Sequence, residues 1–165
     1  MGGARSGKSS FALKLAEKNA KKVAFIASCQ PLDSEMKKRI ILHQKARPVH
    51  WQTFEEPHRI TPLLGKIGGK FQLIIVDCLT LFISNLLLKG FREDSIENEV
   101  NKLLSMLKKI KAQSIIISNE VGLGIIPKNK LARDFRDIAG RMNQLVAQKS
   151  DKVFFMAAGI PLKLK

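Results

Sequence analysis

The segment that most constrains the fold of this chain is a glycine-rich stretch at its start. It fits the pattern G-x-x-x-x-G-K-[ST] and reads Gly2-Gly3-Ala4-Arg5-Ser6-Gly7-Lys8-Ser9. In this pattern the glycines turn backbone N–H groups toward phosphate oxygens, and a following helix adds the partial positive charge of its N-terminus. The lysine reaches the β- and γ-phosphates of a nucleotide, and the last hydroxyl binds Mg²⁺. We therefore expect residues 2–9 to form a phosphate loop, in which Lys8 is catalytic and Ser9 is a metal ligand.

Hydrophobic periodicity in the rest of the chain indicates one α/β domain over residues 1–165. Short apolar runs predict buried parallel strands at residues 22–27, 72–76, 114–117 and 153–157. Helical spacing predicts helices at residues 8–19, 34–46, 80–88, 96–111 and 129–149. We expect a turn at residues 65–69 and a solvated edge strand in the tail at residues 160–165. Because such strands are apolar on both faces, helices should cover both faces of a mostly parallel sheet.

The predicted strand at residues 72–76 is followed by a carboxylate. The run Leu73-Ile74-Ile75-Val76-Asp77 has the form in which phosphate-loop enzymes hold Mg²⁺ with an aspartate at a strand end. An apolar strand that ends in Asp is also a common way for a chain to leave a sheet. Combined with the phosphate loop, the pattern predicts a Mg²⁺ site formed by Ser9 and Asp77.

A strand normally precedes a phosphate loop of this type, yet only Met1 precedes Gly2. That strand would lie centrally in the sheet, so we expect its absence to leave two neighbouring strands with unpaired edges. We therefore expect low stability, and a midpoint of thermal unfolding in the usual range of ~45–65 °C would contradict this expectation.

Charge points to three classes of partner. Of 165 residues, 29 are Lys or Arg and 14 are Asp or Glu, giving a formal net charge of +15. Such a balance suits nucleic acid, a membrane surface or a polyanionic small substrate. The basic residues form no long run, and 9 Phe without any Tyr make a surface for base stacking hard to assemble. Nucleic acid is therefore the less favoured partner.

The remaining composition predicts a soluble cytoplasmic protein. The apolar stretches are far shorter than the ~18 residues of a membrane span, and no secretory signal follows the N-terminus. Two cysteines, Cys29 and Cys78, are too few for a disulfide framework and are expected to be small buried thiols.

The predicted helix at residues 34–46 carries a histidine between two arginines. Asp33 is placed to cap it, and Pro48 ends it by restricting the residue before. Arg39, His43 and Arg47 follow at i, i+4 and i+8 and share one face, which attracts anions. His43 is thus either an imidazole nucleophile or a surface histidine in a basic helix.

Seven motifs distributed over nearly the whole chain carry a family resemblance. They are the phosphate loop, Phe25-Ile26-Ala27-Ser28, the helix motif D-S-E-M-x-x-R-I-x-x-H-x-x-x-R, Trp51-Gln52-Thr53-Phe54-Glu55, Val76-Asp77-Cys78-Leu79-Thr80, and residues 118–127 and 132–144. Together they resemble the bifunctional adenosylcobinamide kinase / adenosylcobinamide-phosphate guanylyltransferase family of cobalamin biosynthesis. Seven motifs in this order are far more specific than a phosphate loop alone.

The resemblance implies a RecA-like P-loop NTPase fold that performs two reactions. A nucleoside triphosphate, ATP or GTP, phosphorylates the aminopropanol hydroxyl of adenosylcobinamide. GMP from GTP is then attached to adenosylcobinamide phosphate with loss of pyrophosphate, giving adenosylcobinamide-GDP. The resemblance places His43 at the histidine that carries the guanylyl group, and it implies Mg²⁺ and a homotrimer. Its nucleotide contacts fall on the phosphate loop and on Ala27, Ser28, Cys29, Gln44, Lys45, Ala46, Arg47, Glu55 and Asp77.

Two further segments and two other functions stay open. Residues 119–122 follow a predicted strand at its carboxyl end, where open α/β sheets bind ligands. Arg133, Asp137 and Arg141 share a helix face and either belong to the site or form surface ion pairs. The alternatives to the enzyme are a basic P-loop module that binds nucleic acid and an inactive, truncated member of the family.

Overall fold

The computed structural model describes residues 1–31 and 33–165, and its centre is a four-stranded parallel sheet. The strand order is β2-β1-β3-β4, and all three pairings are parallel. The four strands are β1 (Val23–Ala27), β2 (Gln52–Glu55), β3 (Leu73–Asp77) and β4 (Gln113–Ile117). β1 and β3 lie in the middle and are almost entirely buried, as their continuous apolar sequences require.

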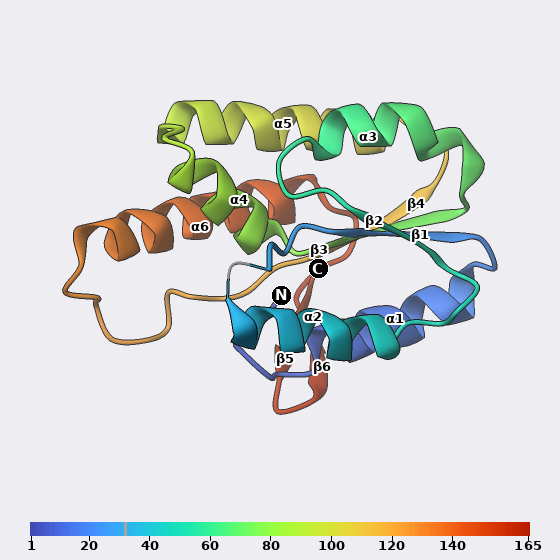
Figure 1. Cartoon of the computed structure of the whole chain (residues 1–165), viewed down its shortest axis with the longest axis horizontal. Coiled ribbons are helices and arrows are strands. Elements are labelled where there is room, and N and C mark those ends of the chain that lie inside the picture. Colours follow the sequence, from blue (N-terminus) through green and yellow to red (C-terminus); the bar gives the residue numbers. More distant parts are fainter. Residues whose placement is uncertain (32) are drawn as a thin grey trace.

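Helices cover both faces of this sheet, as Figure 1 shows. The helices are α1 (Lys8–Asn19), α2 (Ser34–Lys45), α3 (Ile60–Ile67), α4 (Leu79–Leu88), α5 (Glu93–Lys109) and α6 (Lys130–Lys149). On one face Ala12 and Ala16 of α1 pack with Phe25 and Ile75. The larger core lies on the other face, where α3, α4, α5 and α6 pack over β1 and β3. The predicted α/β fold with a parallel sheet between two helical layers is confirmed.

Two elements escaped the sequence analysis, and one prediction is wrong. β2 has only a partly buried phenylalanine among exposed residues, so it lacks the apolar pattern of a strand. The predicted turn at residues 65–69 is wrong, because Gly65 lies inside α3 and residues 68–70 form a short 3-10 helix. Ile60, Leu64 and Ile67 of α3 are buried, and their packing outweighs the helix-breaking tendency of one glycine.

The C-terminal strands do not extend the parallel sheet directly. β5 (Phe154–Ala157) and β6 (Ile160–Lys163) form an antiparallel hairpin, so the prediction of a buried parallel strand at residues 153–157 is wrong. Gly2 forms isolated parallel bridges to both Asn119, just beyond β4, and Met156 of β5. A groove of about 810 Å³ separates the rest of β4 from β5. Gln113 and Ser114 of β4 are accordingly exposed. β4 is therefore an edge strand of the four-stranded sheet.

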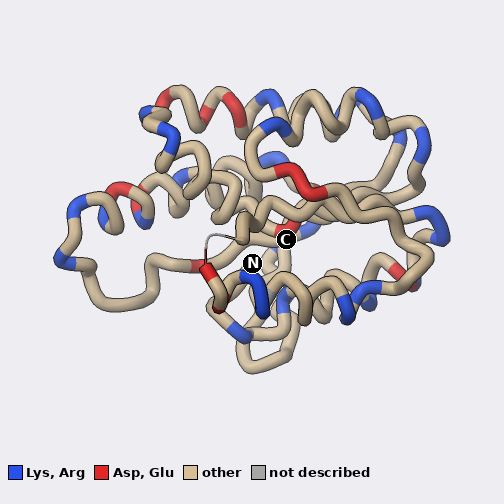
Figure 2. Tube along the Cα trace, viewed as in Figure 1, with Lys and Arg blue, Asp and Glu red and all other residues tan. Residues whose placement is uncertain are grey.

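Basic residues are spread over the molecule. Figure 2 shows Lys and Arg on helices of both layers and at several turns between elements. Among the helices of the described residues, none is both long and apolar enough to cross a bilayer.

Candidate active site

The phosphate loop lies at the N-terminus of α1, with its backbone in conformations that glycine permits. Gly7 precedes the helix with φ of 92°, in the left-handed region where a side chain would be strained. A Cβ on Gly7 would also lie 3.2 Å from the Cα of Gly159, at the turn of the β5–β6 hairpin. The backbone N–H of Gly159 donates to the carbonyl of Ser6 at 3.0 Å. The turn of the β5–β6 hairpin therefore packs against the phosphate loop and is hydrogen-bonded to it.

Lys8 is folded back over the phosphate loop. Its Nζ donates to the carbonyl oxygen of Gly3 at 2.5 Å. Burial lowers the pKa of the Lys8 ammonium, whereas the nearby Cys78 and Asp77 act in the opposite direction. A half-buried ammonium held by one carbonyl is well placed to exchange that contact for a phosphate oxygen.

Asp77 ends β3 directly beside the loop, as the sequence predicts. Its Oδ2 accepts a hydrogen bond from the Ser9 hydroxyl at 3.3 Å. Burial raises the pKa of this carboxyl group, while His43, the Ser9 hydrogen bond, Arg47 and Lys8 act in the opposite direction. Asp77 of β3 thus bonds a residue of α1 and is influenced electrostatically by residues of α2 and of the segment after it.

The structure brings His43 to the same carboxylate. His43 is exposed on α2, yet it is the strongest of the charged groups that offset the burial of Asp77. Asp33 caps α2 by accepting from the backbone N–H of Met36 at 2.7 Å, as predicted. Asp77 thus accepts a hydrogen bond from Ser9 of the phosphate loop, and His43 is near enough to lower the pKa of the same carboxyl group.

The end of α2 and the residues after it are tied to β1 and β2. Gln44 Nε2 donates to Glu55 Oε1 at 2.8 Å, which pairs two of the predicted nucleotide-binding residues. The guanidinium carbon of Arg47 lies 3.9 Å from the ring centroid of Phe25, a cation–π contact. Burial lowers the pKa of Arg47, and Asp77 and Glu55 oppose this effect. Lys45 and Ala46 are exposed, and the side chain of Arg39 lies outside the described part of the structure.

The predicted contacts after β1 differ in accessibility. Ala27 and Ser28 are buried, and Cys29 is partly exposed. Ala27 lies in register between Glu55 of β2 and Asp77 of β3. The Ser28 hydroxyl is bonded to the backbone of Cys78 at both its N–H and its carbonyl. The Ser28 side chain is therefore engaged inside the protein.

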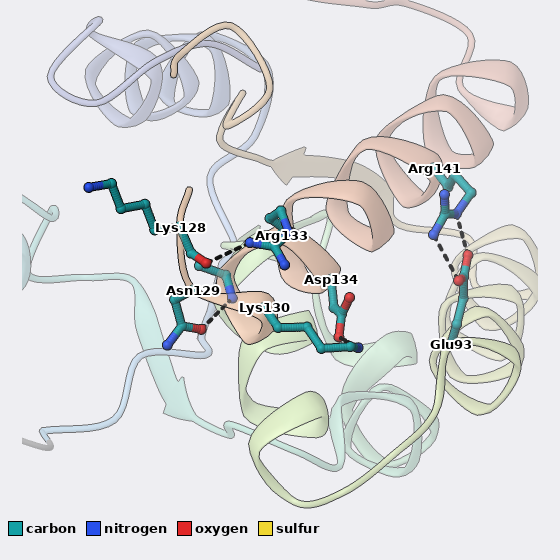
Figure 3. Close-up of polar contacts among 8 residues, drawn as sticks. Glu93, Lys128, Asn129, Lys130, Arg133, Asp134 and Arg141 are labelled. Carbon is teal, nitrogen blue, oxygen red and sulfur yellow. Dashed lines mark hydrogen bonds and ion pairs between the residues drawn. The ribbon is translucent and has the colours of Figure 1, made fainter. Parts of the chain in front are cut away.

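Arg133, Asp137 and Arg141, which share one face of α6, each contact other parts of the protein, and Figure 3 shows Arg133 with Lys128 and Arg141 with Glu93. Arg133 donates to the carbonyls of Pro127 and Lys128 at 3.0 and 2.6 Å. Arg141 pairs with Glu93 at the start of α5, and Asp137 pairs with the adjacent Arg136. Asp137 and Arg141 thus form ion pairs, whereas Arg133 bonds backbone carbonyls. By contrast, Glu120 lies next to the loop, because its N–H donates to the carbonyl of Gly2 at 2.9 Å.

Sequence reasoning missed a set of buried polar side chains behind the site. Asn85, Asn143 and Thr80 lie on helices whose other core-facing residues are apolar. Their hydrogen bonds go to residues at strand ends, including Ser28, Ser118 and Asn119. A polar residue inside an apolar helical stripe, such as Asn85 in LTLFISNLLL, is the sequence signal that identifies them.

The donor set at Ser9 and Asp77 fits Mg²⁺. Both groups offer oxygen, the ligand type that this hard cation prefers, and they are already within hydrogen-bonding distance. The described residues contain no group of three or more His, Cys, Asp or Glu side chains placed to hold a metal alone.

Comparison with known proteins gives consistent matches over the full chain. The family described as "Cobinamide kinase / cobinamide phosphate guanyltransferase" matches residues 1–164. The bifunctional adenosylcobalamin biosynthesis protein CobP of Pseudomonas aeruginosa is 40% identical over 165 residues, covering 100% of this chain and 95% of that protein. The corresponding CobU proteins of Salmonella typhimurium and Escherichia coli are 38% and 36% identical, each covering 99% of this chain and 97% of the relative.

Proposed function

The chain belongs to the cobinamide kinase / cobinamide phosphate guanyltransferase family, and we propose that its 165 residues act as one nucleotide-binding domain carrying both activities. The observation that carries this proposal is the position of Asp77. It is hydrogen-bonded to Ser9 of the phosphate loop and electrostatically coupled to His43 of α2. These two observations support one site in which the phosphate loop binds the triphosphate and His43 is the nucleophile.

In the kinase reaction, the hydroxyl of adenosylcobinamide attacks the γ-phosphorus of ATP or GTP. The bond from γ-phosphorus to the bridging oxygen breaks, the nucleoside diphosphate leaves, and the hydroxyl proton is released. Residues 2–9 hold the phosphates with backbone N–H groups, and Lys8 neutralises charge on the transferred group. Mg²⁺ held by Ser9 and Asp77 would neutralise charge on the triphosphate.

In the guanylyl transfer, a ring nitrogen of His43 attacks the α-phosphorus of GTP and pyrophosphate leaves. A phosphate oxygen of adenosylcobinamide phosphate then attacks the same phosphorus, and the P–N bond breaks to free His43. The imidazole thus divides a difficult displacement by a weak phosphate nucleophile into two easier steps. Arg47, close enough to Asp77 to affect its pKa, is placed to neutralise phosphate oxygens. We assign contacts with the guanosine to Gln44 and Glu55, whose side chains are hydrogen-bonded to each other and offer both donors and acceptors.

Covalent labelling tests this function. Incubation with α-³²P-GTP should leave an acid-labile, alkali-stable label on the chain, and His43→Asn should remove it while phosphorylation of adenosylcobinamide persists. His50→Asn is the matched control, because His50 is also exposed but lies outside α2. Label that survives His43→Asn, or a folded protein without any label, would refute the guanylyl half of the proposal. The second result would favour the inactive family member.

We also propose that the protein is a cytoplasmic homotrimer, as the family resemblance implies. Support comes from three exposed apolar residues between β4 and α6, namely Leu123, Ile125 and Ile126. Apolar side chains gathered on one loop are typical of a surface that contacts another protein. Sedimentation equilibrium should give three times the mass of one chain, and a monomer at micromolar concentration would contradict this assignment.

A further inference from the structure

The buried polar side chains of the described residues gather at one edge of the sheet. They are Ser6, Ser28, Thr80, Asn85, Ser118 and Asn143. Ser28 follows β1, Ser118 follows β4, and Thr80 and Asn85 belong to α4, which follows β3. Burial of a polar group is costly unless it is hydrogen-bonded, so polar groups concentrated at one edge require a reason.

Ser28 makes hydrogen bonds to the backbone of Asp77 and of Cys78. Its Oγ accepts from the N–H of Cys78 at 2.9 Å and donates to the carbonyl of Cys78 at 2.8 Å. Its backbone N–H donates to the carbonyl of Asp77 at 3.0 Å. The side chain is completely buried, so solvent cannot replace these bonds. Cys78, the residue immediately after the candidate metal ligand, is therefore held by two hydrogen bonds from the Ser28 side chain, and the Asp77 carbonyl accepts a third from the Ser28 backbone.

Asn85 extends this arrangement to β2. Its Nδ2 donates to the carbonyl of Ser28 at 2.8 Å and to the carbonyl of Pro57 at 3.1 Å. Pro57 lies two residues beyond Glu55, the last residue of β2. Glu55, Ala27 and Asp77 are in register across β2, β1 and β3. The buried amide of Asn85, on the helix after β3, thus bonds the segments that follow β1 and β2. These are the three strands that end in Ala27, Glu55 and Asp77.

We propose that Ser28 and Asn85 are positioning residues that orient the Asp77 carboxylate toward the metal and nucleotide, Ser28 through the backbone of Asp77 and Cys78, and Asn85 through Ser28. This inference rests on the proposed function, because it takes Asp77 as a Mg²⁺ ligand. Residues that orient metal ligands without touching the metal typically contribute about 10–100-fold to metal affinity. A purely structural role would instead change stability alone.

The experiment measures the thermal unfolding midpoint of the full chain in saturating GTP while Mg²⁺ is titrated. Ser28→Ala should raise the Mg²⁺ concentration for half of the stabilisation by about tenfold. Ser118→Ala is the matched control, because Ser118 is also a buried serine just beyond a parallel strand, and its hydroxyl bonds Asn143. The Mg²⁺ requirement of Ser118→Ala should stay within about twofold of that of the parent protein, because the Ser118 hydroxyl bonds Asn143 and not the backbone around Asp77.

A second variant covers loss of folding. Asn85→Ala removes both carbonyl contacts and should give a smaller shift in the same direction, about threefold, because it acts through Ser28. If both variants are unfolded where Ser118→Ala is folded, the two residues serve stability and the proposal is overturned. An equal change in all three variants overturns it as well.

Asp77→Asn separates this proposal from the function on which it rests. If Asp77→Asn raises the Mg²⁺ requirement while Ser28→Ala does not, only the positioning role fails. If Asp77→Asn leaves the Mg²⁺ requirement unchanged, the metal assignment of Asp77 fails and the positioning role fails with it.

Discussion

The two helices that supply groups to the site are held in very different ways. α1 buries Ala12 and Ala16 against the sheet, and the loop before it contacts β3, through Ser9, and the β5–β6 hairpin. α2 buries none of its described side chains, and Ile41 and Leu42 are 50% and 66% exposed. At its C-terminal end, Gln44 bonds Glu55 of β2, and Arg47, just beyond the helix, stacks on Phe25 of β1.

Phosphate binding by the loop and nucleophilic attack by His43 therefore depend to different degrees on packing against the sheet. The phosphate loop inherits its position from the central strands, because its helix packs directly on them. The nucleophile on α2 depends instead on a few polar and cation–π contacts near its last turn. Both reactions should therefore be sensitive to the loop, whereas only guanylyl transfer should be sensitive to the α2 contacts.

The largest effect should come from the loop. Lys8→Ala removes the ammonium that neutralises phosphate oxygens and should slow both the kinase and the guanylyl reactions by about 10²–10³-fold. Steady-state rates for phosphate and guanylyl transfer, measured in parallel, check this. A loss confined to one reaction would break the expectation that one loop serves both.

The two cysteines should differ in reactivity, because Cys78 is buried near the phosphate loop whereas Cys29, before α2, is partly exposed. Burial, with a smaller contribution from Asp77, raises the pKa of the Cys78 thiol to about 11. At neutral pH its reactive thiolate is therefore about 10²-fold scarcer than that of an ordinary thiol. A thiol reagent should label the partly exposed Cys29, which precedes α2, and reach Cys78 only on unfolding. Equal labelling of both thiols in the folded chain would show that the region beneath the loop is open.

Substitutions in α1 should change the free energy of unfolding more than substitutions in α2. Ala16 is completely buried, so Ala16→Leu overpacks the contact with the sheet and should cost about 1–3 kcal/mol. Leu42 is mainly exposed, so Leu42→Ala should change the free energy of unfolding by no more than about 0.5 kcal/mol. Urea denaturation of the two variants measures both values, and a large cost for Leu42→Ala would mean that α2 is covered in solution.

The smallest effect should come from the α2 contacts. Arg47→Lys keeps the charge but loses the planar group stacked on Phe25, so guanylyl transfer should fall about tenfold and the kinase rate should be unchanged. Lys37→Ala, an exposed change on α2, is the control. An equal fall in both reactions would place Arg47 in the triphosphate site and weaken the contrast between the helices.

Much of the fold was predictable because local signals and tertiary packing agree. The bounds of α1 match the predicted helix at residues 8–19, and the bounds of β1, β3 and β4 differ from prediction by one residue at most at each end. β2 and α3 were missed for opposite reasons. β2 is held mainly by its pairing with β1, and α3 contains a glycine that packing tolerates.

Local sequence specifies the phosphate loop, the helix that follows it and the carboxylate at the end of β3, because each depends on neighbouring residues in the chain. Folding of the whole chain is needed to bring His43 near enough to affect the pKa of Asp77, to pair Gln44 with Glu55, and to place Asn85 against the carbonyl of Ser28. These contacts join residues 11–57 positions apart, and the order of parallel strands that creates them is set by packing of the whole sheet.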